Sequence, residues 1–251
     1  MHTVRDYLEQ WLVDYAGSNT TLKTQQRYAQ LIRNNIAPVL GDTLLDELTP
    51  MDVQSFYSYL LREGRTDGEG GLAPQTVMHI HRLLRKALAQ AERWEIISRN
   101  PADKADPPRV PRTEMAALDR AGLSRLLTSL RGHKLYLPVL IAATTGMRRG
   151  EICGLRWCDI DLNAATLRVN RSMEQTKGRL APKQPKSAKS RREVALAQVT
   201  VDALRAHKNR VDSNPDDLVI RRADGNVYPP DQLSAEFHRH SRKHGFGIRF
   251  H

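Results

Sequence analysis

The sequence predicts a mostly α-helical protein with a small β-sheet or hairpin in its second half, an α+β fold of two domains. Three observations indicate this. Helical spacing of apolar residues recurs four times before residue 100, a proline-rich charged segment follows, and strand-like alternation begins only after Asp161. We therefore expect a helical domain over residues 1–99, a linker over 100–112 and a second domain over 113–251. A chain of 251 residues is long enough to bury two hydrophobic cores.

Each of the four helices expected in the first domain has a recognisable start. Hydroxyl side chains cap helix N-termini, and proline is favoured in the first helical turn because its missing N–H is not needed there. The start signals are Thr3, Thr21, Thr49-Pro50 and Pro74. Pro38 and Gly41 are expected to break the second helix, and the glycine-rich segment 64–71 is expected to form a flexible loop.

The fourth and longest helix is expected to have one apolar and one basic face. The basic face carries His81, Arg82, Arg85, Lys86 and Arg93. Such a face suits the backbone of DNA, and it equally suits an ordinary solvated surface, so the sequence leaves both interpretations open. Arg82, Arg85 and Lys86 are the DNA-binding candidates of this domain.

Residues 100–112 contain four prolines, and we expect them to form an extended linker without regular secondary structure. In the second domain, the apolar run from Leu135 to Ile141 predicts a buried helix that Gly146 ends. The other predicted helices are 118–130, 200–210 and 230–244, and the predicted strands are 166–170, 179–181 and 193–196, with a turn at Lys177-Gly178.

The net charge of +11 is confined to the second domain. Residues 1–112 contain 14 Lys and Arg against 14 Asp and Glu, whereas residues 113–251 contain 25 against 14. A basic half joined to a neutral half indicates a polyanionic partner for the basic half. A surface that is merely basic and soluble is the alternative interpretation.

The composition also indicates the cellular compartment and whether a cofactor is expected. No apolar run reaches the roughly 18 residues that a membrane span requires, and no secretory signal segment opens the chain. Cys153 and Cys158, the only two cysteines, form no disulfide or metal pattern, which fits a reducing cytoplasm. The sequence has no carboxylate cluster suited to Mg²⁺, and we expect neither a metal nor another cofactor.

The segment 143–162 holds the strongest candidate for chemistry. An amphipathic helix is expected to begin here, with Ile152 and Leu155 on its buried face, so that Arg148 lies at a helix start beside a core. An arginine in such a place needs a partner or a function, and Glu151, one turn on, is placed to hold its guanidinium. A structural ion pair at a helix end is one interpretation. An arginine oriented toward a phosphate is the other.

A second basic segment runs from Pro182 to Arg192. It has little apolar content and five cations, Lys183, Lys186, Lys189, Arg191 and Arg192. It is either a disordered basic loop or a basic hairpin that meets phosphates.

Together these residues resemble the tyrosine recombinases of the phage integrase family. Thr145-Gly-Met-Arg-Arg-Gly-Glu151, with Leu155-Arg-Trp157 and Asp159-Ile-Asp161, is close to the first-arginine box of that family. Pro185-Lys-Ser-Ala-Lys-Ser-Arg-Arg192 resembles its lysine hairpin, and Ile248-Arg-Phe-His251 resembles the lead into its His-x-x-Arg box. The three boxes occur in the order of the family, and the resemblance covers nearly the whole chain.

The resemblance implies a SAM-like four-helix core-binding domain followed by a catalytic domain that breaks and rejoins DNA strands through a 3′-phosphotyrosine. It implies that Arg148 contacts the scissile phosphate with Glu151 bracing it, that Lys186 protonates the leaving 5′ oxygen, and that His251 lies near the phosphate. This chemistry is physically reasonable, because fixed cations stabilise charge on the non-bridging oxygens and a lysine can supply the proton.

The resemblance also implies double-stranded DNA as the partner and a homo-oligomer on DNA in the full-length form. Lys183 and Lys189 compete with Lys186 for the role of the hairpin lysine. Further DNA contacts in this domain are expected from Arg149, Lys183, Lys189, Arg191 and Arg192.

The chain departs from the family pattern after His251. The second arginine of the family and its nucleophilic tyrosine would come later, and none of the seven tyrosines of residues 1–251 stands in the motif of the nucleophile. We therefore expect an incomplete catalytic domain, a recombinase by descent that binds DNA without cleaving it. A non-catalytic DNA-binding regulator or an integrase remnant is the alternative, and a basic protein with no role at DNA is the weakest.

Overall fold

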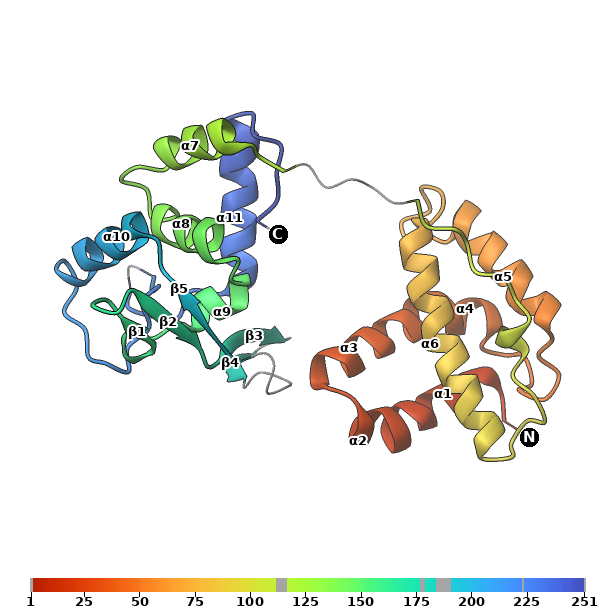
Figure 1. The fold of residues 1–251 in the computed structure, drawn as a ribbon. Coiled ribbons are helices and arrows are strands. Elements are labelled where there is room, and N and C mark those ends of the chain that lie inside the picture. The colour runs from red at the N-terminus through yellow and green to blue at the C-terminus, as the bar shows by residue number, and fades with distance from the viewer. Residues whose placement is uncertain (1, 112–116, 177–178, 184–190, 223, 251) are drawn as a thin grey trace. The chain divides into compact units, whose positions relative to one another are not determined.

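The computed structural model describes residues 2–111, 117–176, 179–183, 191–222 and 224–250, and the chain divides into two compact units, Met1–Thr113 and Glu114–His251 (Figure 1). Each unit has a hydrophobic core of its own. The predicted fold class is confirmed, since helices dominate both units and all of the described strands lie in the second.

The N-terminal unit is built from helices. They are α1 (Val4–Trp11), η1 (Leu12–Ala16), α2 (Gly17–Asn19), α3 (Leu22–Leu31), η2 (Ile32–Ile36), α4 (Ala37–Leu40), α5 (Pro50–Glu63), α6 (Pro74–Arg93) and η3 (Pro101–Asp103), where η1 and η2 are π-helical and η3 is a 3₁₀ turn. The predicted starts are confirmed: the side chains of Thr3, Thr21 and Thr49 accept hydrogen bonds from backbone N–H groups of α1, α3 and α5, and Pro74 is the first residue of α6.

Two expectations for this unit are wrong. Pro38 does not break the second helix but lies in the first turn of α4, directly after η2, where a missing N–H is tolerated. Residues 100–112 do contain regular structure, because the side chain of Asn100 accepts a hydrogen bond from the N–H of Ala102 at 3.0 Å and caps η3. Ala102 and Ala105 are buried in the first core, which explains why this stretch is held against it.

His81 is also misplaced by the sequence pattern, which puts it on the basic face of α6. It is 9% exposed, and its Nδ1 lies 2.8 Å from the hydroxyl oxygen of Tyr57, with which it shares a hydrogen bond. Because residues three and seven apart share a helix face, His81 lies beside the buried Leu84 and Leu88. Burial lowers the pKa of His81, so the ring is neutral inside the core.

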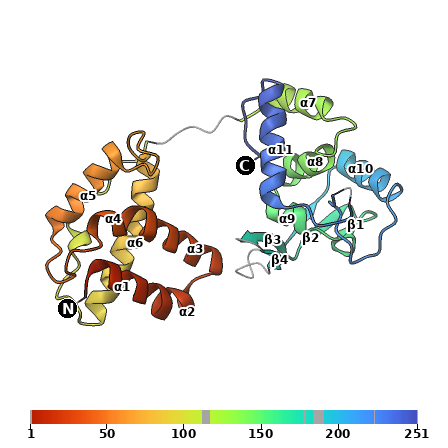
Figure 2. The ribbon, with the colours of Figure 1, turned by 180° about the vertical axis from the view of Figure 1, so that it is seen from behind.

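The second unit contains helices and short strands. Its helices are α7 (Arg120–Ser129), α8 (Tyr136–Thr145), α9 (Arg149–Gly154), η4 (Trp157–Asp159), α10 (Gln198–Lys208) and α11 (Pro230–Lys243), where η4 is a 3₁₀ turn. Within this unit, α7 and the strands lie at opposite ends, α8 and α9 lie between them, and α11 runs alongside (Figures 1 and 2). None of the described helices is long and apolar enough to cross a membrane.

The strands form two antiparallel sheets. They are β1 (Ile160–Asp161), β2 (Thr166–Val169), β3 (Ser172–Thr176), β4 (Arg179–Lys183) and β5 (Arg192–Ala195), and they are arranged as β1-β2-β5 and β3-β4. The three predicted strands correspond to β2, β4 and β5. The sequence pattern misses β3, because only Met173 of its five residues is buried and no alternation of apolar residues is visible.

The described ends of the basic segment 182–192 do not pair with each other. Lys183 lies in β4, which pairs with β3, whereas Arg192 lies in β5, which pairs with β2. The choice between a loop and a basic hairpin over this segment stays open, because most of it lies outside the described residues. The predicted turn at Lys177-Gly178 and residues 184–190 lie outside the described residues.

Candidate functional site

Arg148 is held at the junction of α8 and α9. α8 ends at Gly146, whose φ of 64° lies in the left-handed region that favours glycine, as the sequence predicts. Two residues later, Arg148 is the N-cap residue of α9. Met147 between them is buried at 1% exposure, whereas the side chain of Arg148 is 75% exposed. The turn thus anchors the backbone in the core and leaves the guanidinium at the surface.

Gly150 brings α9 close to β3. A Cβ atom at this position would lie 2.5 Å from Oγ of Ser172 and 2.7 Å from the carbonyl oxygen of Met173, so a larger residue would displace the helix. Ile152 and Cys153 are fully buried and anchor the same helix in the core. This close packing carries Glu151 into the interior beside Arg148.

The carboxylate of Glu151 binds two arginines. Arg148 donates from Nη1 to Oε1 at 3.1 Å and from its backbone N–H to Oε2 at 2.9 Å. Arg192 of β5 donates from Nη1 to Oε1 at 3.1 Å and from Nη2 to Oε2 at 2.8 Å. The predicted pair of Arg148 and Glu151 is confirmed, and the carboxylate has a second, bidentate partner. We refer to these three residues as the Arg148–Glu151–Arg192 cluster.

The electrostatics of the cluster follow from burial and pairing. The side chain of Glu151 is 7% exposed, and burial alone would raise its pKa, but the hydrogen bonds from Arg192 and Arg148 outweigh burial and the pKa is lowered. The hydrogen bond to Glu151 raises the pKa of Arg192. One carboxylate therefore faces two guanidinium groups, and the excess positive charge is presented by Arg148, the more exposed of the two arginines.

Replacing Glu151 by glutamine is expected to lower the free energy of unfolding at neutral pH by about 1.5–3 kcal/mol, the range for hydrogen bonds to charged groups. Because folding lowers the pKa of Glu151, its stabilisation is present above the ordinary pKa of 4.5 and is lost as the pH falls through the folded-state pKa. In urea unfolding, the difference between wild type and Glu151→Gln should therefore shrink below about pH 4.5.

The matched control is Glu193→Gln. Glu193 pairs with Arg168 on β2, and both side chains are more than half exposed. This substitution should change the unfolding free energy by less than about 0.5 kcal/mol. Equal effects of the two substitutions would show that Glu151 has no special stabilising role.

Two of the other candidates of the second domain, Arg149 and Lys183, are held by neighbouring groups. Arg149 pairs with Asp231 at 2.9 Å and donates from Nη1 to Oγ of Ser234, which ties α9 to α11. Lys183 donates to both carboxylate oxygens of Glu174 at 2.8 Å across the β3–β4 pair. Arg191 is exposed just before β5, and Lys186, Lys189 and His251 lie outside the described residues.

The three candidates on α6 differ in their surroundings. Nε of Arg85 lies 2.6 Å from Asp103. Nζ of Lys86 lies 5.5 Å and 5.8 Å from the ring centroids of Tyr15 and Tyr28, within the range of cation–π attraction. Arg82 is exposed. Two of the three cations thus have contacts within their own unit, and their role at DNA stays a prediction.

Comparison with known families identifies both units. Residues 3–61 match the family model for the phage integrase N-terminal SAM-like domain, and residues 117–251, more than half of the chain, match the model for the phage integrase family. The chain belongs to the phage integrase family. The resemblance recognised in the order of the sequence motifs is confirmed.

Relatives of known sequence include integrases from bacteria and phages. An integrase of Saccharopolyspora erythraea is 27% identical over 175 residues, 69% of this chain and 38% of that protein. A tyrosine recombinase XerC-like protein of Caldanaerobacter subterraneus subsp. tengcongensis is 25% identical over 83% of this chain and 56% of its own length. An integrase of Mycobacterium phage FRAT1 is 27% identical over 97% and 69%. The chain thus spans between 38% and 69% of the length of these relatives.

Solved structures share the fold. The integrase of transposon Tn1549, in complex with a circular intermediate DNA, superposes with a TM-score of 0.84 at 20% identity, covering 98% of this chain and 80% of that chain. A lambda integrase dimer bound to a COC′ core site gives a TM-score of 0.74 at 18% identity, covering 99% and 86%. At this level of identity the likeness establishes a common fold of the integrase chains.

Proposed function

We propose that the chain binds double-stranded DNA in site-specific DNA recombination or integration by the tyrosine recombinase mechanism, and that residues 1–251 alone are catalytically incomplete. In this proposal residues 1–99 form the core-binding domain and residues 113–251 the catalytic domain. The observation that carries the proposal is the Arg148–Glu151–Arg192 cluster, in which a buried carboxylate orients an arginine whose side chain stays 75% exposed.

The cluster suits a phosphodiester. Arg148 uses Nη1 for Glu151, which leaves further guanidinium donors for the oxygens of a phosphate. Cleavage of the phosphodiester concentrates negative charge on the non-bridging oxygens, and a cation that is already oriented stabilises this charge without reorganising. Glu151 and Arg192 act as positioning residues, because they hold Arg148 and balance its charge. By family resemblance, Lys186 protonates the leaving 5′ oxygen and His251 lies near the phosphate.

Related structures support the proposed partners. They include the Tn1549 integrase with circular intermediate DNA, lambda integrase as a dimer on a core site, and lambda integrase as a tetramer on a Holliday junction. The charge excess of residues 113–251 supports the same class of ligand. We propose that this chain also assembles with copies of itself on DNA and works in the cytoplasm, where the exposed free thiol of Cys158 stays reduced.

Arg148→Ala tests the role of the cluster in DNA binding. Loss of one exposed phosphate contact should weaken duplex binding by about 1 kcal/mol, or about fivefold. It should also reduce the slope of log affinity against log salt by about 0.9. Both quantities are measured by fluorescence anisotropy with a labelled duplex.

Arg168→Ala is the matched control. The side chain of Arg168 is 72% exposed, close to the 75% of Arg148, but it pairs with Glu193 on the surface of the sheet. Its loss is expected to leave the affinity and the salt slope close to those of wild type. If both substitutions weaken binding equally, the effect is one of net charge and the proposed phosphate contact of Arg148 is wrong.

A further inference from the structure

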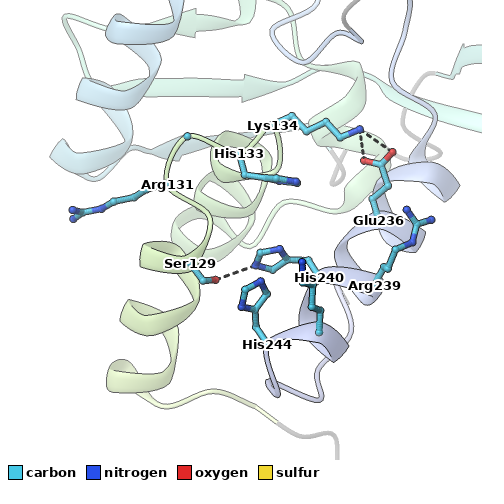
Figure 3. A pocket seen from close by; sticks show the side chains of 10 residues that line it. Ser129, Arg131, His133, Lys134, Glu236, Arg239, His240 and His244 are labelled. Atoms are coloured by element: carbon cyan, nitrogen blue, oxygen red, sulfur yellow. Dashed lines mark hydrogen bonds and ion pairs between the residues drawn. The ribbon is translucent and has the colours of Figure 1, made fainter.

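A second group of charged side chains lies on a different face of α11. A pocket of about 630 Å³ opens between the C-terminal end of α7, the segment 131–134 and the C-terminal half of α11 (Figure 3). On α11, Asp231 pairs with Arg149, and His240 lines this pocket. The two residues are nine positions apart, which is about two and a half turns of an α-helix. The pocket therefore lies on the opposite face of α11 from the contact with Arg149.

Cations outnumber acids around the pocket. It is lined by three histidines and four Lys or Arg residues, against the single carboxylate of Glu236. That carboxylate is fully engaged, because Lys134 and Gln232 donate to it at 2.9–3.0 Å and the hydroxyl of Tyr228 donates to Oε2. Burial would raise the pKa of Glu236, but these hydrogen bonds hold it at about 2.

Three further cations of the pocket lack an acidic partner among the described residues. In the described parts of the chain, no acid pairs with Arg131, Arg239 or Lys243. Figure 3 shows Arg131 directed outward at the rim, and His133 near His240 and His244, whose rings are tilted against each other. The pocket is therefore positively charged on two facing elements, and Glu236 is the one carboxylate among its described lining residues.

The hydrogen bonds decide which ring nitrogens are available. The hydroxyl of Ser129 donates to the carbonyl oxygen of Leu126 at 2.7 Å, so it accepts from Nε2 of His240 at 3.0 Å. Nδ1 of His240 can then take up a proton without loss of the bond to Ser129. His133 differs, since its Nδ1 accepts from the N–H of Leu135 at 3.2 Å and its Nε2 carries the hydrogen. His240 can therefore gain a proton and keep its bond to Ser129, whereas His133 would lose its bond from Leu135 on doing so.

The neighbours of His240 oppose that charge. The ring centroids of His240 and His244 are 4.3 Å apart, and those of His240 and His133 are 5.6 Å apart. Burial, followed by the positive charge of His244, His133 and Lys243, lowers the pKa of His240. Arg131 from the facing segment and Arg239 from α11 add positive charge, and the charges of Lys134 and Glu236 offset each other.

We propose that this pocket is a phosphate-binding site whose affinity rises as the pH falls, and that it takes a phosphate group of a nucleotide or of the DNA backbone. A bound dianion offsets the repulsion among Arg239, Lys243 and the histidines, so anion binding and protonation of His240 favour each other. The helix dipole favours a cation in the last turn of α11, which by itself explains Lys243. It does not explain His133 and Lys134, which lie on the facing segment.

A transition-metal ion fits the same pocket less well. Four Lys and Arg residues would repel it, and the described residues include no group of three His, Cys, Asp or Glu side chains arranged to hold a metal. The charge balance of the pocket thus selects an anion over a cation.

The test is an NMR titration of the whole chain with inorganic pyrophosphate at constant ionic strength, observed on the histidine Cε1–H signals. The signals of His240 and His244 should shift and saturate, with an affinity about three- to tenfold higher near pH 6 than near pH 8, since one unit of pKa shift corresponds to tenfold. Sulfate, which stays dianionic over this range, should show the same trend. A trend with pyrophosphate alone would mean that the ligand and not the protein takes up the proton, and would overturn the proposal.

Variants separate the contributions. His240→Gln keeps a donor for Ser129 but cannot become charged, so it should bind pyrophosphate equally at both pH values. Lys243→Gln should weaken binding at both. His79→Gln and Lys23→Gln, at exposed positions of the N-terminal unit, are the matched controls and should behave as wild type. Absence of saturable shifts, or an unchanged pH dependence in His240→Gln, contradicts the proposal.

A short duplex distinguishes the two sources of phosphate. If the site holds the DNA backbone, the duplex moves the signals of His240 and His244 and His240→Gln removes the pH dependence of duplex binding. If it holds a free nucleotide, the signals follow pyrophosphate and ignore the duplex. The pyrophosphate result stands even if the chain fails to bind DNA, so this proposal and the proposed function fail independently. Signals that follow neither ligand overturn it.

Discussion

The affinity of this chain for a DNA duplex is expected to fall about 10³-fold between 50 and 200 mM monovalent salt, the response of a protein that neutralises about six phosphates. Residues 113–251 carry 25 Lys and Arg against 14 Asp and Glu, whereas residues 1–112 carry equal numbers. Arg85, Arg149 and Lys183 are already paired with acids inside their own units. We therefore expect the phosphate contacts to come mainly from cations of the second domain that are not so paired.

Fluorescence anisotropy at several salt concentrations measures this dependence, with the slope of log affinity against log salt as the readout. A slope near −5 corresponds to about six released counterions, because each neutralised phosphate contributes about −0.9. A second duplex of unrelated sequence shows which part of the affinity is independent of sequence. An affinity that hardly changes with salt would contradict the proposal that the excess positive charge binds the DNA backbone.

A polypeptide of residues 1–251 is expected to form no covalent adduct with a nicked duplex. Tyr7, Tyr57 and Tyr228 are buried, and their hydroxyls are hydrogen-bonded to Ala87, His81 and Glu236. The other tyrosines pack, partly buried, against one of the two cores; they are Tyr15, Tyr28, Tyr59 and Tyr136. A nucleophile must stand within about 3–3.5 Å of the phosphorus and in line with it, which a phenol held in a core cannot do.

Denaturing electrophoresis of the reaction, with label on the DNA strand, detects such an adduct. A tyrosine recombinase of known activity on the same type of substrate is the positive control. Arg148→Ala should leave the null result unchanged while weakening binding, which separates the two roles of the catalytic domain. A stable adduct that disappears when one of the seven tyrosines is changed to phenylalanine would overturn this prediction.

The sequence alone predicts those features of the fold that depend on neighbours along the chain. Thr3 and Thr49 cap the helices that follow them, because a capping hydroxyl reaches an N–H only three residues on. Gly146 ends α8 because its own φ is positive. Arg148 and Glu151 pair for the same local reason, since one helical turn brings them together. The candidate site is predictable to this extent.

Tertiary structure decides everything that joins distant segments. Arg192 is one of five cations in a basic segment, and nothing in that segment distinguishes it. In the structure β5 pairs with β2 so that Arg192 lies opposite Val169, and its side chain contacts Glu151, 41 residues earlier in the chain. His133 and His240 likewise meet only because α11 packs beside α7 and α8. Local patterns carry no register between elements, because register is set by packing in the shared core. The sequence therefore determined the helices and one arginine pair, and the folded core decided which charges share a site.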